Sequence, residues 1–276
     1  MKIITPSYYS EFKCIAQQCR HNCCIGWEID VDPQAMAWYA QYPQIMSHIR
    51  DGAFVLDTQE RCPFLNQEGL CTLILNYGEE SLCQICRDHP RFRNVFSDRV
   101  EMGLGLCCEA AARLVLSQQD PMQLTPFAGD PTPEERQFFN DRRQLFTLLQ
   151  DRTLSFDRRL TRLFGGPLPH AARWVPVYRQ LERLDPAWDA LLDTVGQPRA
   201  HDPVALEQLT AYFLYRHLAD GLADNTLDQR RRFAVLSVQM IRSVDGELAD
   251  AARMYSAEIE YSDQNLQILL SLLEKY

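Results

Sequence analysis

All ten cysteines of this 276-residue chain lie between Cys14 and Cys108, and the rest of the sequence contains none. Cysteines that serve only as small buried hydrophobic residues would be scattered along the chain. Thiols that bind a metal must converge on it, and short cysteine spacings on tight loops achieve this. The distribution therefore predicts a metal-binding module within the first 120 residues.

The cysteines form three groups along the chain. The first runs from Cys14 to Cys24, the second from Cys62 to Cys86, and the third is the pair Cys107-Cys108. Cys108 is the weakest candidate, because one or two thiols could simply be buried and inert. The predicted metal ligands are Cys14, Cys19, Cys23, Cys24, Cys62, Cys71, Cys83, Cys86 and Cys107.

Disulfide bonds are the first alternative, since this cysteine density also occurs in secreted scaffolds. The residues that begin the sequence include no apolar segment of signal-peptide length, so we expect a reducing, cytoplasmic environment. The adjacent pairs Cys23-Cys24 and Cys107-Cys108 could form an internal disulfide only with strain. Both observations favour metal binding over disulfides.

Zinc is the second alternative, since the same cysteines could hold a structural zinc ion instead of an iron–sulfur cluster. Regular zinc modules use two paired C-x2-C knuckles, whereas this sequence has a single one, at Cys83 and Cys86. Few histidines accompany the cysteines, and an all-sulfur ligand set suits an iron–sulfur cluster. The sequence therefore favours iron–sulfur, with 4Fe-4S as the expected form, although the cysteines could also serve two metal centres.

The charge of the chain excludes one large class of partner. The sequence carries 28 basic and 37 acidic residues, with a net charge of −9. Nucleic-acid-binding proteins need a basic surface, so we expect no nucleic-acid partner. No apolar run approaches the length of about 18 residues that a membrane span requires, and we expect no membrane association.

The pattern of apolar residues predicts a mainly α fold in two parts. Residues 1–120 would form the irregular cysteine-rich module, with helices near 32–39 and 109–116 and a short strand at 53–56. A segment rich in proline, 117–134, would end it. Residues 134–276 would form an all-α domain. Its predicted helices are 134–163, 172–195, 203–219, 226–243, 246–260 and 262–274.

Several separate motifs, in the same order along the chain, resemble a known family. The matching stretches are Tyr8-Tyr9-x-x-Phe12-x-Cys14, Asn22-Cys23-Cys24-x-x-Trp27, Cys62-Pro63-Phe64-Leu65, Leu82-Cys83-x-x-Cys86-Arg87-x-His89-Pro90-Arg91-Phe92 and Cys107-Cys108-Glu109-Ala110-Ala111. They are similar to the flagellin lysine-N-methylase family and, more broadly, to CxxCxxCC-type zinc- or iron-chelating domains. The first group departs from the latter pattern, with spacings of four and three residues.

The resemblance implies an enzyme that transfers a methyl group from S-adenosylmethionine to lysine amines of flagellin or of another protein, with an iron–sulfur cluster required. The sequence offers no ordinary cofactor loop for this reaction. Gly103-Leu104-Gly105-Leu106 is the only glycine-rich turn before a helix, and it lacks the third glycine of a dinucleotide-binding loop. We interpret it as a turn that presents Cys107 to the metal.

Aromatic residues around the first cysteines are candidates for cofactor binding. Tyr8, Tyr9 and Trp27 could line a pocket for the sulfonium through cation–π contacts, although core packing is the simpler role for each. Arg87, beside Cys86, would favour thiolates by offsetting their negative charge.

Two residues are candidates for catalysis. Glu109 could accept a proton from the substrate ammonium, or could simply favour the start of a helix. His89 could act as a base or could support a metal ligand. Two functions of other classes remain open at this point. One is a non-catalytic zinc- or iron-chelating interaction module, and the other is an iron–sulfur redox protein.

Overall fold

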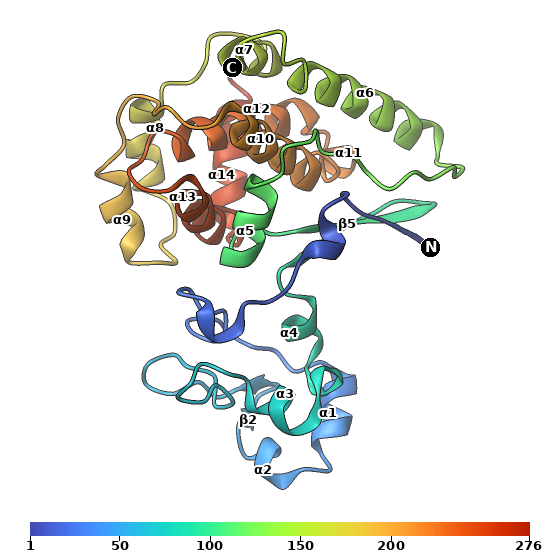
Figure 1. The fold of residues 1–276 in the computed structure, drawn as a ribbon, viewed down its shortest axis with the longest axis vertical. Coiled ribbons are helices and arrows are strands. Elements are labelled where there is room, and N and C mark those ends of the chain that lie inside the picture. Colours follow the sequence, from blue (N-terminus) through green and yellow to red (C-terminus); the bar gives the residue numbers. More distant parts are fainter. The chain divides into compact units, whose positions relative to one another are not determined.

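The computed structural model describes residues 1–276 and confirms a mainly α protein (Figure 1). The chain forms two compact units. Unit 1 combines Met1–Phe12 with Phe92–Tyr276, and unit 2 is Lys13–Arg91. This division differs from the predicted 1–120 and 134–276, because the N-terminal strand and the residues after 92 belong to the helical unit. Unit 2 is thus an insertion in the sequence of unit 1.

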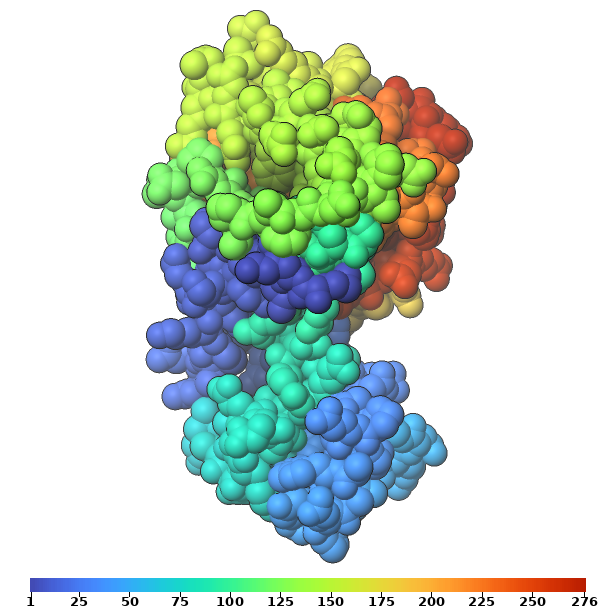
Figure 2. All heavy atoms as spheres, turned by 90° about the vertical axis from the view of Figure 1, so that its right-hand side faces the viewer, coloured from blue at the N-terminus to red at the C-terminus, as the bar shows by residue number.

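A three-stranded sheet explains why the two ends of unit 1 join. Its strands are β1 (Lys2–Ile4), β4 (Arg91–Val95) and β5 (Arg99–Leu104), in the order β1-β5-β4. β1 pairs with β5 in parallel, with Lys2 opposite Arg99. Figure 2 shows the dark blue N-terminal residues against this later part of the chain. The sequence pattern did not predict any of these three strands.

Charged residues within β5 hide its strand character in the sequence. Glu101 is only 1% exposed, a burial that its position in the sequence does not suggest. Arg142 of α6 (Pro133–Leu149) binds both carboxylate oxygens of Glu101, at 2.6 and 2.7 Å. This ion pair joins the sheet to the helices. Gly103 in the same strand is required by packing, since a Cβ there would lie 2.2 Å from the Phe92 ring.

Helices make up the remainder of unit 1. Two of them, α10 (Pro203–His217) and α12 (Leu227–Ile241), pack against each other and are buried on nearly all sides, as expected of central helices. Helices α6 and α7 (Phe156–Phe164) lie on one face of unit 1, seen in yellow-green in Figure 2. The other elements are a 3-10 turn (Tyr9–Glu11), α5 (Glu109–Leu116), α7 (Phe156–Phe164), α8 (Ala171–Tyr178), α9 (Ala187–Leu192), α11 (Gly221–Asp224), α13 (Leu248–Tyr255), a π-helical turn (Ser256–Glu260) and α14 (Asp263–Leu273).

Three of the six helices predicted beyond residue 133 are divided in the structure. The segment 134–163 forms α6 and α7, because Ser155 caps a new helix start. The segment 172–195 forms α8 and α9, with a break before Pro186. The segment 246–260 ends as a π-helix. The predictions for 203–219, 226–243 and 262–274 agree with α10, α12 and α14 within about two residues. No helix combines the length and the apolar character needed to cross a bilayer.

Unit 2 contains little regular structure. Its buried apolar cluster is small and already includes two of the cysteines, Cys62 and Cys83. A domain of this size with so small a core usually needs an additional cross-link for stability. Its elements are 3-10 turns (Ala16–Gln18 and Glu79–Ser81), α1 (Pro33–Tyr39), α2 (Pro43–Met46), β2 (Ile49–Arg50), β3 (Ala53–Phe54), α3 (Thr72–Tyr77) and α4 (Gln84–Asp88).

Asp32 connects two helix starts within unit 2. One carboxylate oxygen accepts hydrogen bonds from the backbone N–H groups of Gln34 and Ala35, in the first turn of α1. The other accepts from the N–H of Gln84, at 2.6 Å, where α4 begins. These bonds, the one from Gln84 foremost, hold the pKa of Asp32 below its usual range. The same carboxylate therefore fixes the loop that carries Cys83.

We predict that Asp32→Ala destabilises unit 2 by about 1–2 kcal/mol, as the loss of a helix cap does. The stabilisation from Asp32 should be present above its unfolded pKa of about 3.9 and should disappear as the pH falls through the lower folded value. Hydrogen exchange at the Gln84 amide measures this directly. Asp30→Ala, two residues away on an exposed side chain, is the matched control. Equal exchange rates in both variants would contradict the prediction.

Candidate functional site

Six cysteines of unit 2 lie close enough to influence one another's ionisation. Cys24 is affected by Cys23, Cys62 and Cys71, and Cys86 is affected by Cys83, Cys24 and Cys62. Electrostatic effects of this kind require proximity. We call these residues the six-thiol group; its members are Cys23, Cys24, Cys62, Cys71, Cys83 and Cys86.

Short backbone pairings bring the first members of the six-thiol group together. The N–H of Cys62 donates to the carbonyl of Cys24 at 2.8 Å, beside an antiparallel bridge between Ile25 and Arg61. A second bridge, between Leu65 and Cys71, folds the intervening loop back on itself. Cys24 and Cys62, which are 38 positions apart in the sequence, thus become neighbours without a long strand.

Helix starts place the remaining members. Cys71 precedes α3 and Cys83 precedes α4, each at the N-cap position, while Cys86 lies inside α4. The Cys83 and Cys86 side chains share a hydrogen bond, which lowers the pKa of Cys83 to about 7 and raises that of Cys86. Burial raises the pKa of Cys62 to about 11. Of Cys62, Cys83 and Cys86, Cys83 is therefore the closest to a thiolate at neutral pH.

All ten cysteines are free thiols. No group of three or more Cys, His, Asp or Glu side chains is arranged to hold a single metal ion. The metal ligands consequently remain predictions. Cys14 is exposed and accepts a hydrogen bond from the N–H of Ala16, and the Cys19 thiol donates to the carbonyl of His21.

The other candidates in unit 2 lie at the end of α4. Burial, followed by the charge of Arg91, lowers the pKa of His89 to about 4, so its imidazole is neutral at physiological pH. Its ring lies 6.5 Å from that of Trp27, centroid to centroid. Arg87 donates to the carbonyl of Leu82 at 2.8 Å. It thereby braces the loop before Cys83.

Cys107 lies in unit 1, within a buried polar network. Its thiol donates to the hydroxyl of Tyr261 at 2.9 Å. Burial raises the pKa of Cys107 to about 12, although the Tyr261 hydrogen bond and the charge of Arg216 act in the opposite direction. The guanidinium of Arg216 lies over the Tyr261 ring, 5.2 Å from its centroid.

Glu260, at the end of the π-helical turn, is the centre of this network. Its carboxylate accepts from Tyr212 at 2.8 Å, from His217 at 2.5 Å and from Arg216 at 3.2 Å. Burial alone would raise the pKa of Glu260, but Arg216 and His217 outweigh it and hold the pKa below its usual value. The hydroxyl of Tyr212 in turn accepts from the backbone N–H of Leu106, directly before Cys107. π-Helical turns are frequent at functional sites.

Three further predicted residues, Glu109, Tyr8 and Tyr9, also lie in unit 1. Glu109 is 2% exposed, begins α5 and pairs with Arg113 at 2.9 Å. Tyr8 is buried in the hydrophobic core, where its hydroxyl donates to the sulfur of Met122, and this position favours its packing role. Tyr9 packs against the same core. The two catalytic candidates, Glu109 and His89, therefore belong to different units.

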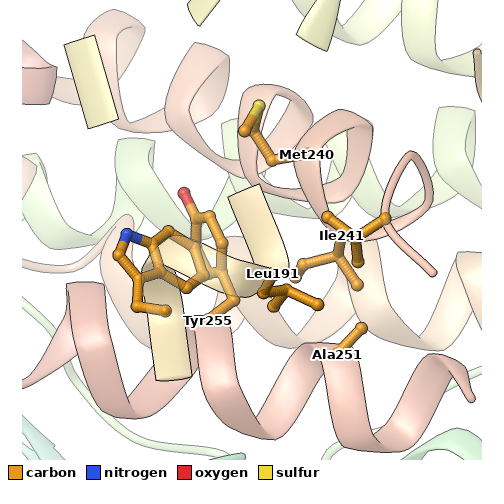
Figure 3. A pocket seen from close by; sticks show the side chains of 7 residues that line it. Leu191, Met240, Ile241, Ala251 and Tyr255 are labelled. Atoms are coloured by element: carbon orange, nitrogen blue, oxygen red, sulfur yellow. The ribbon is translucent and has the colours of Figure 1, made fainter. Parts of the chain in front are cut away.

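A small apolar space lies between α9, α12 and α13 (Figure 3). It leaves no room even for a water molecule, so it is part of the packed core. Its lining residues are Trp188, Leu191, Met240, Ile241, Val244, Ala251 and Tyr255.

Sequence reasoning did not identify Arg216, Glu260 or Tyr261 as neighbours of Cys107. More than 100 residues separate them from it along the chain, and each lies in an ordinary helical pattern. No local motif could have indicated the contact. The acidic residue Glu260 is visible in the sequence of the last predicted helices. Helical spacing alone does not show whether its side chain is buried or exposed.

Comparison with known proteins gives a limited but consistent similarity. The chain is similar to lysine-N-methylases. It is 26% identical over 143 residues to the proteins named "Lysine-N-methylase" of Salmonella typhimurium and Salmonella choleraesuis, which covers 45% of this chain and 36% of theirs. It is 25% identical over 142 residues to the "Flagellar biosynthetic protein FliU" of Salmonella muenchen, covering 84% of that protein.

The similarity therefore spans about a third of the length of the lysine-N-methylases. No family model matches the chain. No solved structure matches it either.

We predict that Glu260→Gln destabilises unit 1 by about 3–5 kcal/mol, because the Arg216 guanidinium, only 12% exposed, would lose its counter-charge. Urea unfolding followed by circular dichroism measures this. Glu274→Gln, on an exposed residue near the C-terminus, is the control and should change stability by less than about 0.5 kcal/mol. A similar small effect of Glu260→Gln would show that the network does not depend on this charge.

Proposed function

We propose that the protein is an S-adenosylmethionine-dependent protein lysine N-methylase that requires an iron–sulfur cluster. The observation that carries the activity is the similarity to proteins named lysine-N-methylase. The six-thiol group supports the cluster requirement. The methyl acceptor would be a lysine of a protein, with flagellin as the first candidate because a related chain is named a flagellar biosynthetic protein.

The residues of unit 2 fit a sulfur-ligated cluster by their chemistry. The six-thiol group contains sulfur donors only, and such a set favours iron–sulfur clusters over oxygen-ligated metals. Zinc remains possible for an all-thiolate set, and metal analysis separates the two. Cys14, Cys19 and Cys107 remain predicted ligands outside the six-thiol group.

Unit 2 also has a structural need for such a group. Its buried apolar cluster is small, and its cysteine loops are held by short bridges instead of long strands. Metal binding to such a module contributes directly to the free energy of folding. A bound cluster would cross-link these loops and would provide a redox-active centre.

The reaction needs a lysine amine that has lost its proton, since the ammonium is not a nucleophile. Glu109 is the proposed acceptor of that proton; it is buried and lies two positions after Cys107 in the sequence. Within unit 2, Trp27 and His89 form an aromatic pair, and we propose it as a binding site for a cationic group. Arg87 would favour thiolates in the neighbouring loop.

Methyl transfer tests the proposed activity directly. The full chain, purified without oxygen, would be incubated with methyl-labelled S-adenosylmethionine and flagellin, and the flagellin peptides analysed by mass spectrometry. We expect a single-methyl mass increment on lysine, absent without S-adenosylmethionine and reduced at least about 100-fold by Glu109→Gln, the loss typical of a general base. If no protein lysine acquires label, the methylase proposal fails, and the interaction-module and redox functions take precedence.

We predict that Cys83→Ser or Cys24→Ser lowers bound metal to less than half of the wild-type amount, since each removes a member of the six-thiol group. Metal content per chain, determined after anaerobic purification, is the measurement. Cys108→Ser is the matched control and should retain the full amount. Unchanged metal in both Cys83→Ser and Cys24→Ser would refute the proposed ligand set.

A further inference from the structure

Three aromatic side chains gather in unit 2, apart from the residues assigned to methyl transfer. Trp38 lies in α1, Tyr42 directly precedes α2, and Tyr77 ends α3. The ring centroids of Trp38 and Tyr42 are 4.5 Å apart, those of Tyr42 and Tyr77 4.9 Å, and those of Trp38 and Tyr77 5.5 Å. We call these three residues the aromatic patch.

The aromatic patch is held by the protein on one side and reaches solvent on the other. All three rings pack against the buried apolar cluster of unit 2, yet each of them is only half-buried. The side-chain amide of Gln44 donates to the Tyr77 hydroxyl at 3.0 Å and fixes the position of that ring. Because the rings contact one another, a ligand would lie on their exposed outer surface, and an enclosed cavity is not required.

A carboxylate lies beside the aromatic patch. Both carboxylate oxygens of Glu80 are 2.9 Å from the position that a Cβ would take on Gly78, the residue after Tyr77. Glu79 and Glu80 are both exposed, and neither forms an ion pair. The helices that carry the aromatic patch contain no charged residue, so no basic side chain on them opposes this negative charge.

Aromatic faces next to an acidic side chain suit an alkylammonium ion. A cation is attracted to the face of a tryptophan or tyrosine ring, and recognition of methylated lysine is a main functional use of this attraction. Each methyl group on the nitrogen replaces an N–H group, so less hydration is lost when the ammonium moves onto the rings. The Glu80 carboxylate attracts the same positive charge, and it would repel an anionic ligand.

We propose that the aromatic patch, together with Glu80, binds methylated lysine side chains of the substrate protein; this choice of ligand rests on the proposed function. The ammonium would lie over the exposed rings, with the carboxylate facing its charge. Lysine without a methyl group has the same charge and would bind more weakly. The aromatic patch would thus retain a protein that already carries one methyl group, so that further lysines of that protein react before it dissociates.

Titration of the full chain, purified without oxygen, tests this with three small probes. They are the Nα-acetyl amides of Nε-methyl-lysine, of lysine and of norleucine, and the last has a similar apolar stem without the charge. The NMR shift of the Trp38 indole N–H, assigned by its loss in Trp38→Phe, reports binding at this surface. We expect the methyl-lysine probe to bind most tightly and the norleucine probe at least about fivefold more weakly.

Variants that keep the Trp38 signal separate binding from packing. Glu80→Gln and Tyr42→Leu should each weaken binding of the methyl-lysine probe by about two- to fivefold, the usual effect of an exposed charge or aromatic face. Glu80→Gln alters an exposed residue and serves if Tyr42→Leu does not fold. The matched controls, Glu68→Gln in unit 2 and Tyr276→Leu, at an exposed aromatic residue in unit 1, should bind as the wild type does.

The outcomes separate this inference from the proposed function, because methylation of flagellin is measured on the same preparation. Equal binding of the methyl-lysine and norleucine probes, or unchanged binding in both variants, overturns this inference, while methylated flagellin leaves the proposed function in place. Tighter binding of lysine than of methyl-lysine overturns the assigned ligand. Binding as expected without any methylation supports the binding surface and rejects the methylase. If neither binding nor methylation occurs, both proposals fail.

Discussion

Six thiols that influence one another's ionisation are the feature around which unit 2 is organised. The unit has a small buried apolar cluster and only short helices and strands, so hydrophobic burial contributes little stability compared with a domain of regular structure. Backbone bridges next to Cys24 and Cys71, together with two helix starts, bring the thiols together. A metal or cluster held there would supply the cross-link that the core does not.

Unit 1 is stabilised differently. Its centre is formed by helices buried on all sides, and its buried charges are compensated in place. Glu101 pairs with Arg142, and Glu260 is surrounded by three donors.

The sequence predicted the mainly α character and most helices of unit 1, because their apolar periodicity and caps are local signals. It did not predict the sheet, since Glu101 and Arg99 conceal the alternation of β5 and since a three-residue partner strand leaves almost no pattern. The sequence also did not predict the boundaries of the two units. The pairing of β1 with β5 spans about the whole of unit 2, and no local feature encodes such a contact.

The candidate site shows the same division between local and distant information. The clustering of cysteines along the chain predicted nine metal ligands, six of which make up the six-thiol group, and the roles of Glu109 and His89 stay predictions. The partners of Cys107 come from the last third of the chain. Contacts between such distant residues are decided by the fold, and only the structure reveals them.

The central claim is that unit 2 holds an iron–sulfur cluster. Iron, acid-labile sulfide and zinc would be quantified on the same anaerobically purified full chain, together with its Mössbauer spectrum. We expect iron and sulfide in equal amounts, a spectrum typical of a cluster, and negligible zinc. Stoichiometric zinc without sulfide would contradict the claim and would make unit 2 a structural zinc module.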